Sequence, residues 1–266
     1  TITHGDVMIN LRNLAIRKKL WLLTLITAIG LIAITTLALQ KYRQDLMKEK
    51  MNQTQMLVES AYSLIEKQHN LVKSGDIKTE EARRRAADAI KSLRYDGNNY
   101  FWINDLDALL VMHPIKPQLD GNDMSSFTDP EGKRIFIEFV SVAKNQGEGV
   151  VPYLWPKPGS ENPVQKISYV KAFKPWGWVV GTGVYVDDVE SEFWSNAFML
   201  SAAAVILLAA LLSLSIVITR SVVNPLLETT AALDDIATGD GDLTRRLNTE
   251  GNDEIAKLSS SFNPVS

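Results

Sequence analysis

The chain has 266 residues, of which 28 are Lys or Arg and 31 are Asp or Glu, giving a net charge of −3. So small a charge argues against a protein that holds nucleic acid through its phosphates. The chain has no Cys, which excludes disulfides, Cys-ligated zinc and thiol nucleophiles. Its three His are scattered, so we expect no His-rich metal site.

Two uncharged stretches predict membrane-spanning helices. Residues 20–39 and 197–219 are apolar and contain no Asp, Glu, Lys or Arg. A helix of about 20 apolar residues crosses the roughly 30 Å of hydrocarbon in a lipid bilayer. The alternative is a buried helix of a soluble protein, but such helices rarely run this far without a charge. We therefore expect two transmembrane helices.

Basic residues predict how these helices are oriented. Arg17, Lys18 and Lys19 precede the first stretch, and Arg220 follows the second. Basic flanks favour the cytoplasmic side, so we expect both termini in the cytoplasm and the segment between the spans in the periplasm, outside the cell inner membrane. The predicted organisation is a cytoplasmic N-terminus (1–19), a first span (20–39), a periplasmic domain (40–196), a second span (197–219) and a cytoplasmic tail (220–266).

The periplasmic segment predicts an α+β domain. Apolar residues at helical spacing indicate a long helix over 42–72 that continues the first span, then a second helix that begins at Thr79 and ends by Gly97. Short aromatic and β-branched runs, separated by Gly and Pro, predict strands. We expect strands at 100–104, 108–113, 149–155, 164–173 and 178–186, with a helix at 135–144. This order implies one antiparallel sheet with helices packed on a face.

Several motifs in this segment appear in the order typical of a known family. They read YFWIND, VMHPIKPQLDGND, DPEGKRIFIEFV, GEGVVPYLWPKPG and PVQKISYVKAFKPWGWVVGTGVYVDDV. The segment resembles the single Cache domain, a small PAS-like sensor of bacterial methyl-accepting chemotaxis proteins. The resemblance implies long N-terminal helices and a five-stranded antiparallel sheet between the two transmembrane helices.

The tail, residues 220–266, resembles a HAMP linker. Apolar residues step by four and three, as in a coiled-coil seam, and a Gly-Asp run, Gly239 to Asp242, separates them from a second short seam. The first seam is Val222, Leu226, Thr229, Leu233 and Ile236; the second is Ile255, Leu258 and Phe262. The alternative, a disordered tail, explains neither seam. The resemblance implies a parallel four-helix bundle, and therefore a homodimer.

The resemblance implies that the ligand is a C2–C3 monocarboxylate such as acetate, propionate or pyruvate. A carboxylate in a partly dry pocket needs a cation or several donors, and its short alkyl tail needs apolar walls. Lys166 is the first candidate cation, because it begins an otherwise apolar strand; the alternative is a lysine at the rim, in solvent. Arg94 is the reserve cation.

Hydroxyls, one imidazole and aromatic rings complete the predicted site. Tyr153 and Tyr169 are candidate hydroxyl donors, although strand alternation puts Tyr169 opposite Lys166 unless the strand bulges. His113 ends a strand with Leu109 and Val111 on its face. Tyr100, Trp102 and Trp155 are candidate walls that could equally be plain core. The acidic loop 120–132 does not fit an EF-hand and is expected to be solvated.

We therefore expect a sensor without enzyme activity and without a cofactor: a chemoreceptor that binds a small acid and relays the signal through HAMP. Its output partners would be an adaptor and a histidine kinase reached through a further cytoplasmic domain. The alternatives are a sensor histidine kinase or nucleotide cyclase with the same front end, or a passive membrane anchor. We expect the chain to be the front part of a longer protein, and residues 1–7 to precede its natural start.

Overall fold

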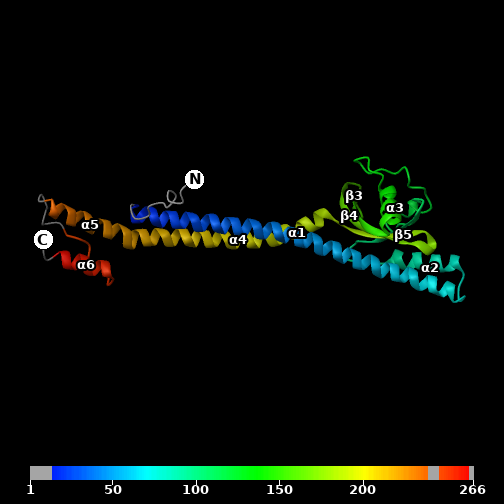
Figure 1. The fold of residues 1–266 in the computed structure, drawn as a ribbon, viewed down its shortest axis with the longest axis horizontal. Coiled ribbons are helices and arrows are strands. Elements are labelled where there is room, and N and C mark those ends of the chain that lie inside the picture. The colour runs from blue at the N-terminus through cyan, green and yellow to red at the C-terminus, as the bar shows by residue number, and fades with distance from the viewer. Residues whose placement is uncertain (1–13, 239–245, 264–266) are drawn as a thin grey trace, which may run out of the picture. The chain divides into compact units, whose positions relative to one another are not determined.

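The computed structural model describes residues 14–238 and 246–263, without the side chains of Ile236 and Phe262. The chain divides into two compact units, an α+β unit of Leu39–Ala197 and a helical unit made of Thr1–Ala38 and Phe198–Ser266. Two long helices contribute to both units (Figure 1): α1 is Ile16–Lys73 and α4 is Val186–Ile218.

A five-stranded antiparallel sheet forms the centre of the α+β unit. Its strand order is β2-β1-β5-β4-β3, so the last strand of the chain lies in the middle of the sheet. The predicted α+β fold with two apolar helices and one antiparallel sheet is confirmed. The strands are β1 (Phe101–Asp105), β2 (Leu110–Met112), β3 (Glu148–Pro156), β4 (Pro163–Phe173) and β5 (Trp178–Tyr185).

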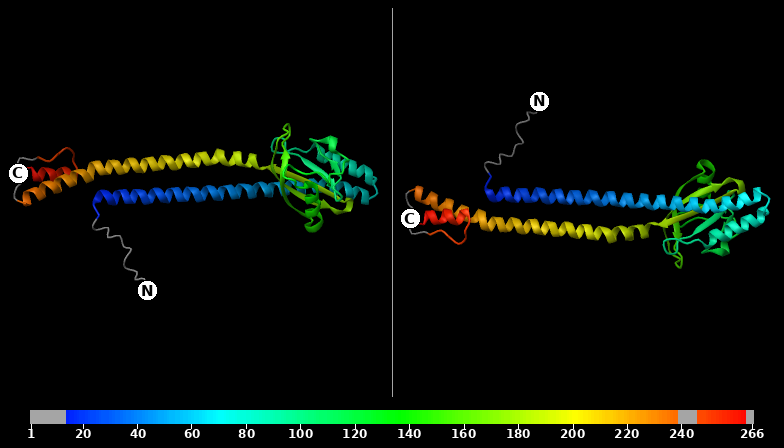
Figure 2. Two further views of the ribbon diagram at one scale, coloured as in Figure 1. Left: turned by 90° about the horizontal axis from the view of Figure 1, so that it is seen from above. Right: turned by 90° about the horizontal axis from the view of Figure 1, so that it is seen from below.

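Helices cover both faces of this sheet, not one face as the sequence suggested. The second half of α1 and α2 (Thr79–Ser92) lie side by side across one face (Figure 2), where Ile65 and Ile90 pack against strand residues such as Val180. Helix α3 (Ile135–Gln146) covers the other face with Phe136 and Phe139. The strands therefore bury side chains on both sides, which obscures the alternation of a half-buried strand.

Helix α2 shows how the sequence specifies the first of these layers. Ala82, Ala86 and Ile90 recur every four residues and are fully buried, while acidic residues occupy the first turn, where they suit the helix dipole. The helix ends at Ser92, before the predicted stop at Gly97. Small buried residues let α2 approach α1 closely.

The first turns of α4 pack against α1 within the α+β unit. Leu46 contacts a cluster that includes Val189 and Phe193. Two ion pairs flank this cluster: Arg43 with Glu190 at 2.6 Å and Lys50 with Glu192 at 2.9 Å. These contacts join α1 to α4, and α4 is also continuous with the sheet, because it begins at Val186 directly after β5 ends at Tyr185.

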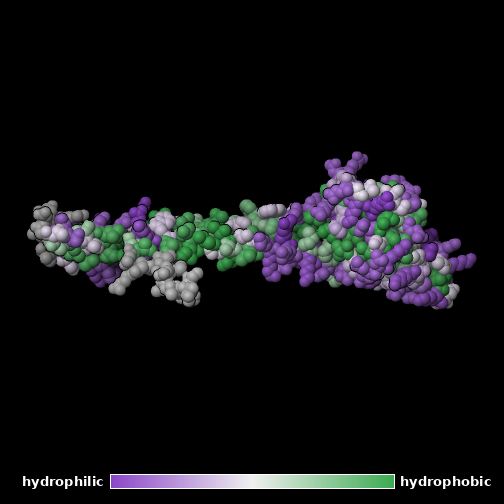
Figure 3. All heavy atoms as spheres, turned by 45° about the horizontal axis from the view of Figure 1, so that its top comes forward, coloured by the Kyte–Doolittle hydropathy of each residue, from purple (hydrophilic) through white to green (hydrophobic). Residues whose placement is uncertain are grey.

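In the helical unit, α1 and α4 are long and apolar enough to cross a membrane, as predicted. Their uncharged residues are exposed; Leu23 is 60% and Ile206 is 68% exposed. Figure 3 shows this apolar surface, whereas the surface of the α+β unit is mostly polar. The hydroxyls of Thr24 and Ser215 hydrogen-bond to one another. Exposed apolar side chains of this kind suit contact with lipid.

Two short helices, α5 (Asn224–Ala237) and α6 (Glu254–Phe262), follow α4 after a π-helical turn, Thr219–Val223. Thr229 is buried, while the seam residues Leu233 and Leu258 are 51% and 42% exposed and therefore available to a second copy. The amide of Asn263 exchanges two hydrogen bonds with the backbone of Leu247, which fixes the connector against α6. The predicted break at Gly239–Asp242, and the side chains of Ile236 and Phe262, lie outside the described residues.

Candidate ligand-binding site

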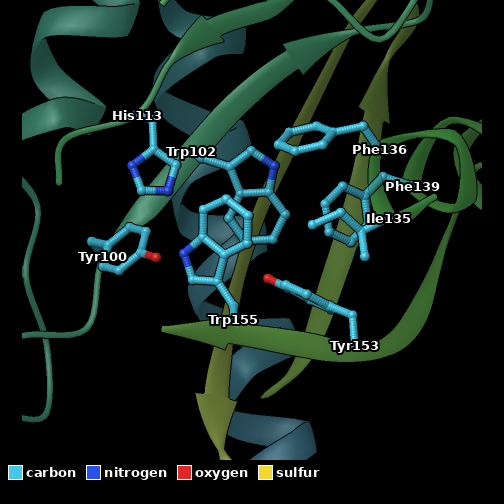
Figure 4. A pocket seen from close by; sticks show the side chains of 8 residues that line it. All are labelled: Tyr100, Trp102, His113, Ile135, Phe136, Phe139, Tyr153 and Trp155. Carbon is cyan, nitrogen blue, oxygen red and sulfur yellow. The ribbon is translucent and has the colours of Figure 1, made fainter. Parts of the chain in front are cut away.

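A small cavity lies between the sheet and α3 (Figure 4). Its volume is about 10 Å³, enough for the centre of about one water molecule. The hydroxyls of Tyr100 and Tyr153 point towards its centre. Its lining side chains are Tyr100, Trp102, His113, Ile135, Phe136, Phe139, Tyr153 and Trp155. Five of the sequence candidates therefore meet in one cavity.

Strand alternation brings the aromatic candidates together. Tyr100 and Trp102 stand two residues apart at the start of β1, and Tyr153 and Trp155 stand two apart on β3, so each pair shares a face as predicted. Trp102 lies flat over β5 because residue 181 is Gly; a Cβ there would come within 2.5 Å of the indole. Its Nε1 donates to Asn104 Oδ1 at 3.1 Å.

Lys166 is buried beneath these rings. It is 1% exposed, which rules out the alternative of a solvated rim lysine. Its Nζ lies 4.2 Å from the ring centroid of Tyr100 and 4.6 Å from that of Tyr185. In the sheet it stands between two tyrosines, opposite Tyr153 on β3 and opposite Tyr185 on β5. The rings separate Nζ from the cavity, so Lys166 is next to the cavity without lining it.

The charge of Lys166 is poorly compensated. Its Nζ donates to the hydroxyl of Tyr185 at 3.4 Å, and within residues 14–238 and 246–263 it forms no ion pair with a carboxylate. Aromatic faces attract a cation but replace only part of its hydration. Burial accordingly lowers the pKa of Lys166 to about 7. An incoming carboxylate would supply the missing counter-charge.

His113 is a neutral hydrogen-bond donor at the cavity wall. Burial, with help from the nearby cations Lys166 and Lys116, lowers its pKa to about 3. Its Nδ1 accepts the backbone N–H of Lys116 at 3.0 Å and that of Ile115 at 3.3 Å. An acceptor nitrogen carries no proton, so the proton of the neutral ring resides on Nε2. That N–H is of the kind that binds a carboxylate oxygen.

The prediction that Leu109, Val111 and His113 share one face of the sheet is wrong. Strand β2 ends at Met112, and its pairing with β1 shifts between Ile103 and Asn104. Leu109 is 38% exposed and Val111 packs on the opposite side of the sheet, while His113 turns into the cavity. A bulge of this kind breaks the simple alternation on which the prediction rested.

Two sequence candidates do not join the site. Tyr169 lies on the opposite face of the sheet, in the cluster that packs against α1 and α2, because β4 does not bulge between it and Lys166. Arg94 is exposed after the end of α2 and donates to the carbonyls of Lys91 and Leu93. The structure therefore places neither residue where it could contact a ligand in this cavity.

Two polar residues of the site escaped the sequence reasoning. Ser168, fully buried, shares a hydrogen bond of 3.0 Å with the hydroxyl of Tyr153. Tyr185 contacts Lys166 and donates from its hydroxyl to the carbonyl of Pro156 at 3.0 Å. Burial raises the pKa of Tyr185 to about 12, so this phenol keeps its proton. Only the register of β4 against β5 shows that Tyr185 is the neighbour of Lys166.

The acidic loop is mostly exposed, as expected, and among its acidic residues Asp129 is the exception. Asp129 is 5% exposed, and its carboxylate accepts the backbone N–H groups of Glu131, Lys133 and Leu154. These bonds outweigh the effect of burial and lower its pKa. Asp120 accepts the N–H of His113 at 2.7 Å and so positions that residue. Across the described part of the chain, no acidic or His side chains gather as a metal site would require.

Comparisons with known proteins agree with this architecture. A family model described as Cache domain, of the dCache_2 type, matches residues 31–199, and the HAMP domain model matches residues 217–263. The chain is 40% identical over 96% of its length to the methyl-accepting chemotaxis protein McpP of Pseudomonas putida. It is 31% identical over 62% of its length to the sensor histidine kinase MctS of Rhizobium johnstonii. The chain spans 47% of the first relative and 37% of the second.

Two solved structures each match about half of the chain. One, a periplasmic sensor domain of a chemotaxis protein, is 52% identical with a TM-score of 0.52, over 53% of this chain and 97% of that one. The other, described as "Structural basis for carboxylic acid recognition by a Cache chemosensory domain", is 45% identical with a TM-score of 0.52, over 54% of this chain and 97% of that one. The chain belongs to the Cache domain family, and its Cache domain is followed by a HAMP domain.

Proposed function

We propose that the α+β unit binds a small monocarboxylate, of two or three carbons, such as acetate, propionate or pyruvate. The observation that carries the proposal is Lys166, a cation 1% exposed that no described carboxylate pairs with. A carboxylate bound there would form a charge-assisted hydrogen bond in a site of low dielectric constant, the setting in which such bonds are strongest. The relative whose structure concerns carboxylic acid recognition, 45% identical, supports the same chemistry.

The neighbouring groups suit the remaining parts of such a ligand. His113 offers an Nε2–H, and Tyr153 has a hydroxyl that also bonds Ser168. Trp155 and Phe136 provide apolar walls for one or two methyl or methylene groups. The carboxylate would thus meet one cation and two neutral donors, and the alkyl tail would meet rings.

The size of the cavity restricts the ligand. It has room for about one water molecule, and the ring of Tyr100 stands between it and Lys166. A monocarboxylate of two or three carbons must therefore displace side chains, above all Tyr100, to reach Nζ. Each added methylene demands further displacement of a packed core, which disfavours longer acids.

The output is proposed from the arrangement of the rest of the chain. Basic residues flank the apolar segments at Lys19 and Arg220, which supports an inner-membrane protein with both termini in the cytoplasm and the sensor in the periplasm. The exposed seam residues of α5 and α6 would pair in a homodimer. By likeness to McpP, the signal would reach an adaptor and a histidine kinase, as in chemotaxis.

A sensor histidine kinase is the second candidate, because MctS shares 31% identity over 62% of this chain. Both candidates use the same sensor, so the sequence that follows residue 266 in the reading frame decides between them. A long heptad hairpin indicates chemotaxis, and an ATP-binding domain indicates a kinase.

Isothermal titration calorimetry with acetate, propionate, pyruvate and lactate tests the proposal. Acetamide and propionamide are matched controls, since they keep the shape of the acids and remove the charge. We expect at least one acid to bind and neither amide to bind. Binding of the amides with equal affinity, or no binding of any acid, would contradict the proposal.

A further inference from the structure

Tyr185 occupies the junction between the buried cation and the output helix. It is the last residue of β5, and α4 begins at the next residue, Val186. Its hydroxyl accepts a hydrogen bond from Lys166 Nζ at 3.4 Å and donates one to the carbonyl of Pro156 at 3.0 Å. The side chain is 1% exposed.

Ion pairs on the protein surface also connect the end of β3 to the start of α4. Lys157 follows Pro156 at the end of β3, and its Nζ lies 2.7 Å from Asp187 and 2.6 Å from Asp188, in the first turn of α4. Lys157 Nζ also lies 5.5 Å from the ring centroid of Tyr185. Contacts therefore join the end of β3, Tyr185 and the first turn of α4.

We propose that Tyr185 is the positioning residue that converts occupancy of the Lys166 site into a displacement of α4. The inference rests on the proposed function. The Lys166 ammonium has N–H groups to spare, so a carboxylate draws Nζ towards itself, and the bond of 3.4 Å to the Tyr185 hydroxyl is weak enough for that shift to break it. Once released, the phenol keeps its bond to Pro156 and its interaction with Tyr100, and its change of position is passed to Val186 through the backbone and to Asp187 through Lys157.

Tyr185→Phe separates this role from a structural one. The ring and its contacts with the two lysine side chains remain, while both hydrogen bonds of the hydroxyl are lost. Tyr95→Phe is the matched control, because the Tyr95 hydroxyl also bonds β5, at Thr182 and Gly183, without contacting Lys166. If loss of a hydroxyl bonded to its neighbours only disturbed the structure, both variants would alter the response to propionate.

Spin labels measure the displacement in the full chain. The sequence has no Cys, so Asn145→Cys on α3 and Ser195→Cys on α4, both exposed, introduce a unique pair within the α+β unit. The distance between the labels is measured by double electron–electron resonance with and without saturating propionate. Propionate affinity is measured in parallel by calorimetry.

We expect propionate to change the distance in the parent and in Tyr95→Phe. In Tyr185→Phe we expect no change in distance at a propionate concentration that calorimetry shows to be saturating for that variant. An unaltered distance change in Tyr185→Phe would overturn the proposal.

A second experiment uses no ligand, so it tests the role of Tyr185 independently of the proposed ligand. Lys166→Met removes the N–H donor, so it should change the label distance in the parent and cause no further change in the Tyr185→Phe background. If the parent binds no acid, the proposed function fails and this experiment alone decides. Equal shifts in both backgrounds, or none in the parent, would overturn the role of Tyr185.

Discussion

Lys166 and Tyr185 lie directly opposite one another in the β4–β5 ladder, with Nζ and the phenol oxygen 3.4 Å apart. Both side chains are 1% exposed. Because β5 ends at Tyr185 and α4 starts at Val186, the buried cation is one cross-strand contact from the output helix. The proposed ligand site and the helix proposed to carry the signal are thus neighbours, and the predictions below test each side of that contact.

Replacement of Lys166 by Met should abolish acid binding while the protein stays folded. Loss of a buried charge partner weakens binding by about 2–5 kcal/mol, so we expect at least about a thirtyfold loss of affinity in calorimetry. Stability should not fall, because removal of an unpaired buried charge leaves no carboxylate without a partner.

Lys171→Met is the matched control on the same strand. Lys171 pairs with Glu59 and Glu148 on the far side of the sheet, so this variant should lose about 1 kcal/mol of stability and keep its affinity. Equal losses of affinity in both variants would show that general damage, and not the charge of Lys166, explains the effect.

Stability should rise with pH above neutrality. The pKa of Lys166 is about 7 in the folded state against 10.5 for an unperturbed lysine, so the unfolded state binds more protons between these values. The free energy of unfolding then increases with pH from about 7 to 10.5, by at most about 1.4 kcal/mol per unit. Below pH 7 both states are protonated, and the desolvation penalty applies in full.

Urea unfolding of the α+β unit at pH 6, 7.5 and 9, with Lys166→Met as reference, measures this effect. The other titratable groups that face Lys166 are His113, Tyr100, Tyr153 and Tyr185; burial holds His113 neutral and raises the pKa of each tyrosine. In the folded state they should not change charge over this range, and the titration of His113 in the unfolded state is common to both proteins. Parallel pH profiles for the two proteins would contradict a lowered pKa of Lys166.

Acid affinity should fall as the pH rises through 7. A carboxylate prefers the protonated amine, so above its pKa each pH unit lowers the affinity by up to about tenfold. Below pH 6 the affinity should level off. Calorimetry in buffers of different ionisation enthalpy should also detect proton uptake on binding at pH 8, and uptake should be absent in any variant that lacks the amine.

Gly181→Ala should damage the site through Trp102. The added Cβ would come within 2.5 Å of the indole, so the ring must leave its place over β5 and its hydrogen bond to Asn104. We expect a loss of about 1–3 kcal/mol in stability and a weaker affinity for acids. Gly30→Ala, where nothing lies within 4 Å, is the neutral control; an equally neutral Gly181→Ala would contradict the packing of Trp102.

Tyr153→Phe and Tyr169→Phe distinguish the two faces of the sheet. Tyr153 bonds Ser168 and lines the cavity, whereas Tyr169 packs towards α1 and α2. Loss of the Tyr153 hydroxyl should weaken acid binding by about 1 kcal/mol, and loss of the Tyr169 hydroxyl should leave it unchanged. The reverse order of effects would mean that the ligand binds on the face of the sheet that α1 and α2 cover.

Periodicity predicted much of the fold. The spacing of Ala82, Ala86 and Ile90 specified α2 and its buried face, and two-residue alternation paired Tyr100 with Trp102 and Tyr153 with Trp155. Alternation also placed Tyr169 away from Lys166. These features depend on neighbours along the chain, which a sequence displays directly.

Periodicity could not predict the register between strands or the irregularity in β2. The shift between Ile103 and Asn104 separated His113, which lines the cavity, from Leu109 and Val111, with which it was predicted to share a face. The neighbour of Lys166 on β5 depends on which residues of two strands align, and that alignment is set by the whole sheet. The aromatic enclosure of Lys166, and with it the role of Tyr185, emerges only when the strands are paired.

A crystal structure of the α+β unit with bound propionate is the most direct test of the central claim. The account predicts a carboxylate oxygen about 2.7–2.9 Å from Lys166 Nζ, the second oxygen within hydrogen-bond distance of His113 Nε2, and the ring of Tyr100 displaced. Propionate bound elsewhere, with Lys166 still enclosed by Tyr100 and Tyr185, would contradict it.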